Sequence, residues 1–520
     1  MKKHRTWLAL IIAFASGLAL AALLAIFQPG EWLSGWLAFS ALLVPGIFLI
    51  ILLWRHAGGG VKLAWLLALA LLLRAGIGIA LELALPVAGS GSEQQAAGYV
   101  FYDAYHRDGQ AWSLAASGEP LSLAFSKSYS MDQYGGLLWT SAAAYRLLSP
   151  DAHRPLLVIL LAALAAAAGV ALGWKAARLA WGEAMSAPVA FLLALYPESL
   201  LQGSSQMREP FLITFTCMAF LGAVEWPEAR RSAMAWLAAG FAGMLLFSPG
   251  VAIFMLIVLA GWLWLGRSQG RISWKTLLII AGVLVLALVL LWAGVRRGNL
   301  DDGSPLGVVL GWLKFSSLWD IHLLEQNSGR VQMIFETLPA WLHLPFVMGY
   351  GLAQPVLPAA IADPTLWPWK VIGILRSAGW YALAPFLLYA LVAILRRPKQ
   401  ERSPWLWLWV ATWGWMILSA VRAGADQWDN PRYRVISLLL QAALFAFAWT
   451  RSRGDPWLGR VLIVEGIFLV FFGQWYASRY TGAFGKLPFN TMVILIISLS
   501  ALVVLGGWWL DRRKSRRRGA

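Results

Sequence analysis

Long apolar runs separated by short polar loops dominate the chain. A helix needs about 20 mostly apolar residues to cross a bilayer, and the chain contains fourteen runs of about that length. The pattern therefore predicts an all-α polytopic membrane protein with about 14 transmembrane helices. The predicted spans are 7–27, 32–54, 62–86, 155–178, 186–203, 209–225, 232–248, 250–266, 274–294, 371–395, 405–421, 433–450, 458–476 and 489–510.

The first apolar run has two interpretations. It follows a basic N-terminal segment and contains the sequence Ala13-Phe14-Ala15, which is typical of a signal-peptide cleavage site. The run 7–27 is long for the apolar part of a signal peptide. We therefore favour a retained membrane anchor over a cleaved signal.

Composition supports lipid as the solvent for most of the chain. Hydrophobic residues make up 60% of the 520 residues and charged residues only 13%, about half the usual charged fraction of a soluble protein. The net charge is +17, but the basic residues form short clusters between apolar runs, which argues against a nucleic-acid-binding stripe. The single cysteine, Cys217, excludes a disulfide framework and a cysteine-based metal site.

The distribution of charge predicts the orientation in the membrane. Short cytoplasmic loops collect Lys and Arg, and placing the N-terminus inside puts 25 of the 42 Lys and Arg residues on the cytoplasmic face. The acidic residues fall mostly on the other face. We expect a multi-pass cell-membrane protein with both termini in the cytoplasm and its active site on the outer face.

Two predicted outer segments are too long to be simple connectors. The first contains the amphipathic stretches 109–116 and 134–148, which we interpret as helices lying in the membrane interface. The predicted organisation is an N-terminal group of transmembrane helices at 1–86, a first outer loop with interfacial helices at 87–154, a central bundle at 155–295, a second outer loop at 296–370, a C-terminal bundle at 371–510 and a basic cytoplasmic tail at 511–520.

Several common catalytic motifs are missing from the sequence. It has no phosphate-binding P-loop, no dinucleotide-binding glycine motif, no His-Glu-x-x-His and no Gly-x-Ser-x-Gly. Nucleotide hydrolysis and metalloprotease chemistry are therefore disfavoured. The candidate functional residues are the acids and arginines that lie where the chain leaves the membrane on the predicted outer side.

The first outer loop carries the first candidate acids. Asp108 precedes an amphipathic stretch, so it is either a helix N-cap or a carboxylate that accepts a proton from an acceptor hydroxyl. Asp103 is its rival in the same loop. Tyr102 and His106 are candidate substrate-binding residues, and of the six histidines only His106 lies near these acids in the sequence.

A second candidate set opens the predicted span 209–225. Arg208-Glu209-Pro210 fits the beginning of a helix, with proline in the first turn and an acid at the positive end of the helix dipole. The alternative is functional, because burying an Arg-Glu pair at the rim of a bundle costs desolvation energy. Glu209 is then a candidate catalytic residue and Arg208 a candidate substrate-binding residue.

A third set, Asp426 to Arg434, precedes and opens the predicted span 433–450. Arg432 and Arg434 lie on the outer side, against the usual charge distribution. They either contact lipid phosphates or bind the phosphate of a lipid-linked substrate, for which a guanidinium group is well suited. Arg74 and Glu465 also lie inside predicted spans, and we favour structural roles for both.

These motifs, in this order, resemble the GT-C fold glycosyltransferases. That family comprises polyprenyl-phosphate-sugar-dependent enzymes related to protein O-mannosyltransferases and lipid A aminoarabinose transferases. The likeness is strongest over 95–225. Its residues are Asp108, Trp112, Ala115 and Gly118, then Tyr134 to Trp139, Tyr196-Pro197-Glu198, Arg208-Glu209-Pro210 and, later, Asp429 to Arg434.

The resemblance implies an inverting sugar transfer in which Asp108, or failing it Asp103, deprotonates the acceptor and arginines meet the charge of the leaving phosphate. The sequence also departs from the family pattern. Asp108-Gly109 stands where many members have paired acids, Glu209 replaces a commoner Asp, and the first outer loop follows the third span instead of the first. No metal or other cofactor is therefore assigned.

The leading hypothesis is a membrane glycosyltransferase that moves a sugar from a polyprenyl-phosphate donor to a hydroxyl of a lipid, glycan or protein acceptor. One alternative is a polymerase or ligase of lipid-diphosphate-linked glycan, which differs in the size of its donor. The other is a transporter or flippase. A transporter needs polar groups along a path through the membrane and often two related halves, and this sequence offers neither.

Overall fold

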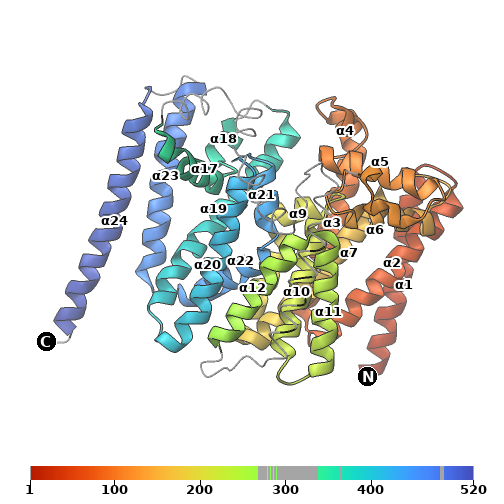
Figure 1. Cartoon of the computed structure of the whole chain (residues 1–520), viewed down its shortest axis with the longest axis horizontal. Helices are drawn as coiled ribbons and strands as arrows, with labels where there is room; N and C mark the ends of the chain where they lie inside the picture. Colours follow the sequence, from red (N-terminus) through yellow and green to blue (C-terminus); the bar gives the residue numbers. More distant parts are fainter. Residues whose placement is uncertain are drawn as a thin grey trace. The chain divides into compact units, whose positions relative to one another are not determined.

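The computed structural model describes residues 2–129, 131–266, 338–362, 365–424, 426–480 and 485–518, with isolated positions 278, 282, 285 and 289. All regular structure in these residues is helical (Figure 1). Within these residues, eight helices are long and apolar enough to cross a membrane, and ten spans result if each of two bent helix pairs counts as one. The all-α, multi-pass membrane architecture is confirmed. The count of 14 stays a prediction, since most of the predicted span 274–294 lies outside the described residues.

Contacts divide the chain into two compact units, and each is described by itself. Unit 1 comprises residues 1–318 and 435–442, and unit 2 comprises 319–434 and 443–520. The described elements of unit 1 are α1 (Lys2–Phe27), α2 (Trp32–His56), α3 (Val61–Ala88), α4 (Glu93–Ala96), α5 (Tyr102–Ala116), η1 (Leu121–Phe125), η2 (Lys127–Tyr129), α6 (Gly136–Leu148), α7 (Leu156–Trp181), α8 (Glu183–Leu195), α9 (Pro197–Gly203), α10 (Glu209–Glu225), α11 (Arg230–Phe247) and α12 (Pro249–Gly266).

The core of unit 1 is built around α7. This helix is buried over most of its length, and its run of alanines and glycines lets neighbouring helices approach closely. At Gly169 an added Cβ would lie 2.7 Å from the Thr214 hydroxyl oxygen of α10. Helices α10 and α11 meet in the same way at Gly240, where an added Cβ would lie 2.7 Å from the Phe215 carbonyl oxygen. Small residues therefore set the helix spacing in this unit.

Two predicted spans are broken helices. The span predicted at 186–203 is α8 followed by α9, with a bend of 54° between them. Pro197 causes the break, because proline has no backbone N–H to donate and disfavours helical geometry in the preceding residue. Tyr196 accordingly has an extended backbone. The span predicted at 433–450 is likewise α21 (Asp429–Val435) followed by α22 (Leu438–Arg451), bent by 74°.

The predicted first outer loop contains the two expected helices, α5 and α6. They run across the end of unit 1 that lies opposite the N-terminus (Figure 1). Helix α5 begins at Tyr102, six residues before Asp108, so the N-cap interpretation of Asp108 is wrong. Asp132 is the acid that caps the start of α6, because its Oδ2 accepts the backbone N–H groups of Leu137 at 2.8 Å and Leu138 at 3.1 Å.

Unit 2 contains the remaining helices. The predicted second outer loop, 296–370, is described only from residue 338, and its acids Asp301, Asp302, Asp320, Glu325 and Glu336 lie outside the described residues. The described helices that lie mostly or wholly in unit 2 are α17 (Ala340–Ala353), α18 (Leu357–Ala362), α19 (Trp367–Leu395), α20 (Lys399–Arg422), α21, α22, α23 (Pro456–Tyr480) and α24 (Phe489–Arg518). The end of α21 and the first residues of α22, within 435–442, belong to unit 1.

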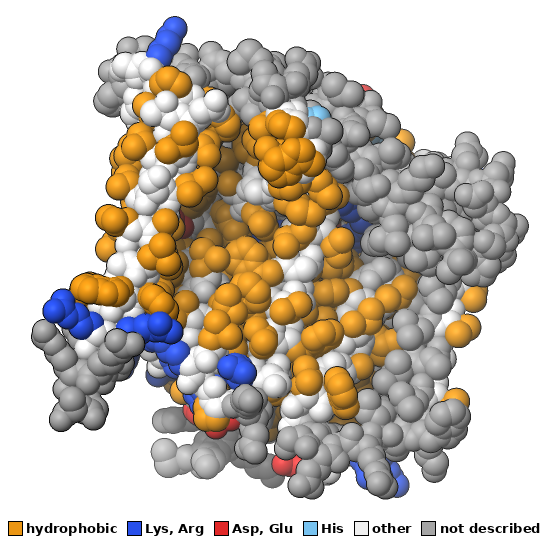
Figure 2. All heavy atoms as spheres, turned by 60° about the vertical axis from the view of Figure 1, so that its left-hand side comes forward, with side chains coloured by type: hydrophobic (Ala, Val, Ile, Leu, Met, Phe, Trp, Pro, Cys, Tyr) orange, Lys and Arg blue, Asp and Glu red, His pale blue; other side chains and the backbone are white. Residues whose placement is uncertain are grey.

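Helices α23 and α24 have the surface expected of helices that face lipid. Large apolar side chains such as Val470 and Leu502 are exposed along them. In Figure 2, hydrophobic side chains cover this side and basic side chains gather at one end. The guanidinium of Arg512 lies 3.8 Å from the ring centroid of Trp508, a pairing typical of the membrane interface.

Candidate functional site

Asp108 is the centre of a polar cluster in unit 1. Its neighbours on the same helical stripe, Ala104 and Ala111, are buried, and Asp108 itself is only 2% exposed. The Tyr145 hydroxyl donates to both carboxylate oxygens, at 2.7 Å and 2.8 Å, and the Tyr99 hydroxyl donates to Oδ2 at 2.7 Å. Three donors therefore meet this carboxylate, the third being an imidazole.

The imidazole belongs to His153, which lies just before α7. Its Nε2 is 2.9 Å from Asp108 Oδ2. The ring stacks on Trp112, with centroids 5.3 Å apart and planes 18° apart, and meets the edge of Tyr145 at 5.0 Å. The His153 side chain is 28% exposed, whereas that of Asp108 is 1% exposed. His153 is thus the accessible member of the pair.

The two tyrosine hydroxyls stay protonated over a wide pH range. Burial raises the pKa of Tyr99 above its usual value, and the charge of Asp108 and the hydrogen bond to it act in the same direction. The pKa of Tyr145 is raised well above its usual value for the same reasons, burial first. Both phenols therefore remain donors, and they stabilise an ionised carboxylate at a position where water is excluded.

A second carboxylate lies in the same electrostatic environment. Glu82 of α3 interacts with both Asp108 and His153, and its Oε1 accepts a hydrogen bond of 3.1 Å from Gln28. The cluster therefore joins residues from α3, α5, α6 and the segments before α2, α5 and α7. Residues 28, 82, 99, 108, 145 and 153 come from separate segments of the chain, and only packing brings them together.

The other candidates of the first loop are more exposed to solvent than Asp108. Asp103 is exposed in the first turn of α5, and Tyr102 is 57% exposed. The ring of His106 lies 4.2 Å from that of Tyr102 and 5.0 Å from that of Tyr105, measured between centroids. Tyr105 donates a hydrogen bond of 3.1 Å to Glu93, which raises the pKa of Tyr105. These residues form an aromatic surface beside the buried cluster.

Arg208 and Glu209 lie next to α5. Arg107, the neighbour of Asp108, donates from Nη2 to the carbonyl of Gln206 at 2.6 Å, so α5 and the segment before α10 are joined directly. Arg208 and Glu209 are both buried, with Nε and Oε1 4.0 Å apart. The Arg208 guanidinium also lies 5.6 Å from the Tyr134 ring centroid. Glu209 begins α10, as the sequence predicted, and the pair belongs to the same unit as Asp108.

Arg432 and Arg434 lie in unit 2. The Arg434 guanidinium lies 3.6 Å from the Trp380 ring centroid, and its Nη2 donates to the Gln354 carbonyl at 2.9 Å. Arg432 donates to Asp429 at 3.2 Å. A further buried arginine of this unit, Arg376, stacks on an aromatic ring as Arg434 does. No motif in the sequence marked Arg376 as a candidate, since it lies in an ordinary apolar run.

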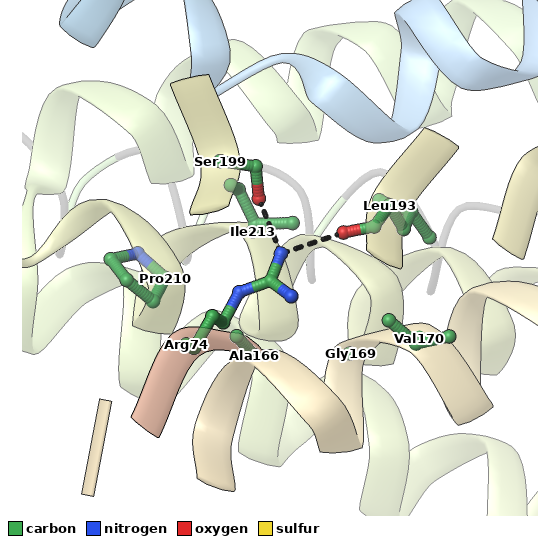
Figure 3. A pocket seen from close by; sticks show the side chains of 8 residues that line it. All are labelled: Arg74, Ala166, Gly169, Val170, Leu193, Ser199, Pro210 and Ile213. Carbon is green, nitrogen blue, oxygen red and sulfur yellow. Dashed lines mark hydrogen bonds between the residues drawn. The ribbon is translucent and has the colours of Figure 1, made fainter. Parts of the chain in front are cut away.

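Arg74 has a structural role, as its place inside a predicted span suggested. Its guanidinium donates to the carbonyls of Leu193 and Ala194 at 2.9 Å and 2.8 Å and to the Ser199 hydroxyl at 2.9 Å. Pro197 leaves the Leu193 carbonyl without its helical donor, and Arg74 supplies one across the break (Figure 3). The small, mostly apolar cavity beside it has room for about one water molecule.

Sequence reasoning missed His153, Tyr99 and Tyr145. His153 stands 45 residues from Asp108, and no local spacing links them. The available signal was its position directly before a helix on the predicted outer side, in the run Asp151-Ala152-His153-Arg154-Pro155. Among the described residues, no group of three or more His, Cys, Asp or Glu side chains is arranged to hold a metal ion.

Comparison with known proteins gives a limited likeness. No family model matches the chain, and no curated protein matches it. Similar solved structures include archaeal oligosaccharyltransferase AglB from Archaeoglobus fulgidus in complex with an inhibitory peptide and a dolichol-phosphate. It has 13% identity and a TM-score of 0.39, over 87% of this chain and 56% of that chain.

Crystal structures of the Archaeoglobus fulgidus oligosaccharyltransferase give similar values. The apo form has 12% identity and a TM-score of 0.39, over 84% of this chain and 54% of that one. The complex with Zn and sulfate has 15% identity and a TM-score of 0.40, over 83% and 53%. This chain thus spans little more than half the length of these neighbours. By name these neighbours transfer glycans, as do the enzymes that the sequence resembles. At this level of similarity, evidence for the function of this chain comes from its own side chains.

Proposed function

We propose that the protein is a membrane glycosyltransferase that moves a sugar from a polyprenyl-phosphate donor to a hydroxyl of a lipid, glycan or protein acceptor on the outer face. One observation carries the proposal. A buried carboxylate, Asp108, is hydrogen-bonded to an accessible imidazole on an amphipathic helix at the end of unit 1 opposite the N-terminus (Figure 1). Such a pair is suited to accept a proton from a hydroxyl group.

The position of the pair favours a lipid-linked substrate. Helix α5 runs across the end of a bundle whose helices have membrane-spanning length, so in a membrane it would lie near the depth of the lipid headgroups. A donor whose isoprenoid chain stays in the bilayer would present its phosphate and sugar at that depth. The chemistry of sugar transfer itself comes from the resemblance of the first-loop and Arg208 motifs to polyprenyl-phosphate-sugar-dependent enzymes.

The phosphate that leaves carries negative charge, and fixed cations lower the cost of its departure. Arg208 is the candidate in unit 1, because it is buried near α5 and its Nε has no hydrogen-bond partner among the described residues. In unit 2, Arg432 and Arg434 are the candidates. Arg434 is engaged with a carbonyl and a tryptophan ring, and Arg432 pairs with Asp429 at 3.2 Å, so both remain candidates.

In this proposal each carboxylate has a separate task. Asp108 is the carboxylate of the acid–base centre, and Asp103, exposed in the first turn of α5, is the alternative. Glu209 is buried beside Arg208 and would hold that guanidinium in place. Tyr102 and His106 provide an aromatic surface on which the sugar ring or acceptor would rest.

The test is a transfer assay with purified protein in liposomes. Two labelled donors are supplied, a polyprenyl-phosphate monosaccharide and a polyprenyl-diphosphate oligosaccharide, with membrane lipid, glycan and peptide acceptors. Asp108→Asn is expected to lower the transfer rate by about a hundredfold or more, within the usual range for loss of acid–base catalysis. The matched control is Glu183→Gln, at an exposed carboxylate of α8, which should keep the wild-type rate.

Three outcomes oppose the proposal in different ways. Transfer from the diphosphate donor alone would replace it with a glycan ligase or polymerase. A full rate in Asp108→Asn with loss of activity in Asp103→Asn would move the centre to the exposed acid. No transfer from either donor to any acceptor would overturn the function. Thermal unfolding of each variant in detergent separates loss of chemistry from loss of fold.

A further inference from the structure

We propose that His153, and not Asp108, is the group that takes the proton from the acceptor hydroxyl, while Asp108 acts behind it as a positioning residue. This inference rests on the proposed function and identifies the atom at which the proton transfer occurs. The carboxylate is closed off, with a side chain only 1% exposed and three donors around it, whereas the His153 side chain is 28% exposed. An acceptor can reach the imidazole without displacing any of those donors.

The imidazole is held in one orientation. Nε2 faces Asp108 at 2.9 Å, one face of the ring stacks on Trp112, and Tyr145 meets it edge-on. A neutral imidazole that donates from Nε2 to a carboxylate carries its lone pair on Nδ1. Nδ1 makes no hydrogen bond to any described residue. A carboxylate therefore fixes the tautomer, and the second nitrogen is left as the proton acceptor.

The surroundings can also hold the proton once it has been taken. Asp108 and Glu82 are the carboxylates that act on His153, and the raised pKa values of the neighbouring tyrosines keep both phenols neutral. Asp151 is occupied elsewhere, because it forms an ion pair of 2.7 Å with Arg154 and accepts a hydrogen bond from Ser34. An imidazolium at His153 would thus face the carboxylate of Asp108 on α5, 2.9 Å away.

The proposed step balances as follows. The acceptor O–H bond breaks, and its proton moves to Nδ1 of His153. The acceptor oxygen forms a bond to the anomeric carbon of the sugar, and the bond from that carbon to the phosphate oxygen breaks. The electron pair of that bond leaves with the polyprenyl phosphate, and the imidazolium later releases its proton to water.

The experiment compares pH–rate profiles at saturating donor and acceptor for the wild type, His153→Gln and the control His343→Gln in unit 2. Glutamine keeps a hydrogen-bonding side chain but cannot accept a proton near neutral pH. We expect His153→Gln to lower kcat by about a hundredfold to ten-thousandfold with little change in the KM for the donor. The fall in rate on the acid side of the wild-type profile, where the imidazole becomes protonated, should also disappear. His343→Gln should keep the wild-type rate and profile.

A second variant distinguishes loss of the proton acceptor from loss of fold. His153→Ala opens a space beside Trp112, and free imidazole in the assay should restore a measurable part of kcat in a pH-dependent way. If His153→Gln is folded and retains the wild-type kcat and acid limb, the inference is wrong and Asp108 or Asp103 acts directly. It is equally wrong if imidazole restores nothing to folded His153→Ala. If the wild type transfers no sugar at all, the proposed function fails instead, so the two failures can be told apart.

Discussion

The buried charges of the two units are stabilised in different ways. In unit 1, Asp108 is met by side chains, with Tyr99, Tyr145 and His153 donating from three separate segments. In unit 2, Arg434 is met by a backbone carbonyl of Gln354 and by an aromatic face. A carbonyl is present at every residue, so many sequences offer one at a helix end. A carboxylate surrounded by two phenols and an imidazole requires particular residues at particular places.

Arg74 shows that this contrast does not merely separate unit 1 from unit 2. Arg74 is a buried charge of unit 1, yet its guanidinium donates to backbone carbonyls next to the end of a helix, as that of Arg434 does. The two arginines are therefore best understood as donors to carbonyls that their helices leave unpaired. Among these three buried charges, the Asp108 cluster is the one whose surroundings suit chemistry.

The largest expected effect concerns the two arginines. Arg74→Met and Arg434→Met should each lower the free energy of unfolding by about 3 kcal/mol, because buried carbonyls are left without a donor. The measurement is unfolding in detergent micelles, by heat or denaturant. The exposed Arg453 of unit 2 provides a control, and Arg453→Met should change stability by less than about 0.5 kcal/mol. If Arg434→Met keeps the wild-type stability and raises the KM for the donor, Arg434 binds a ligand and does not share the structural role of Arg74.

A smaller effect is expected from the phenols around Asp108. Tyr145→Phe removes a hydroxyl that lies within 2.8 Å of both carboxylate oxygens, and should cost about 2 kcal/mol of stability, as for a hydrogen bond to a charged group. Tyr99→Phe removes one bond and should cost about 1 kcal/mol. Tyr102→Phe, at an exposed ring of the same region, is the stability control. Equal stability of all three variants would show that the cluster does not depend on its phenols.

An effect that is absent near neutral pH is a pH dependence on the alkaline side. Folding raises the pKa of Tyr99 and Tyr145 above the usual 10.0, so the folded state keeps these protons at a pH where the unfolded chain loses them. Their contribution to stability is complete below pH 10 and falls as the pH rises beyond it, by about 1.4 kcal/mol per pH unit for each hydroxyl. Stability measured from pH 8 to 11 should show this fall, and Tyr99→Phe and Tyr145→Phe should each make it shallower. An unchanged slope in both variants would contradict the assignment.

Much of the local structure could be predicted. The spans predicted at 32–54, 62–86 and 155–178 correspond to α2, α3 and α7 within a few residues, because hydropathy is a local property. Arg208-Glu209-Pro210 begins α10 for an equally local reason, the fixed geometry of proline in a first helical turn. Pro197 also indicated a break in the helix, and the prediction of one continuous span at 186–203 missed it.

The candidate site could be predicted only in part. Asp108 was identified, but its N-cap interpretation failed because α5 starts at Tyr102. His106 was assigned to substrate binding, and His153, whose imidazole reaches Asp108, was not singled out. Proximity in sequence favoured His106, which shares a helix with Asp108 and packs against Tyr102 and Tyr105. The partner that reaches the carboxylate is brought there by the chain returning through α6.

The amino-acid sequence by itself determined that this chain is a bundle of apolar helices with polar helices in its first long loop, because the need to hide backbone groups from lipid acts on each segment separately. Tertiary structure alone decided which side chains share the buried space around Asp108, and which carbonyls Arg74 and Arg434 would pair. Those contacts join residues separated by tens to more than a hundred positions. Their formation depends on how whole helices pack, and no short stretch of sequence carries that information.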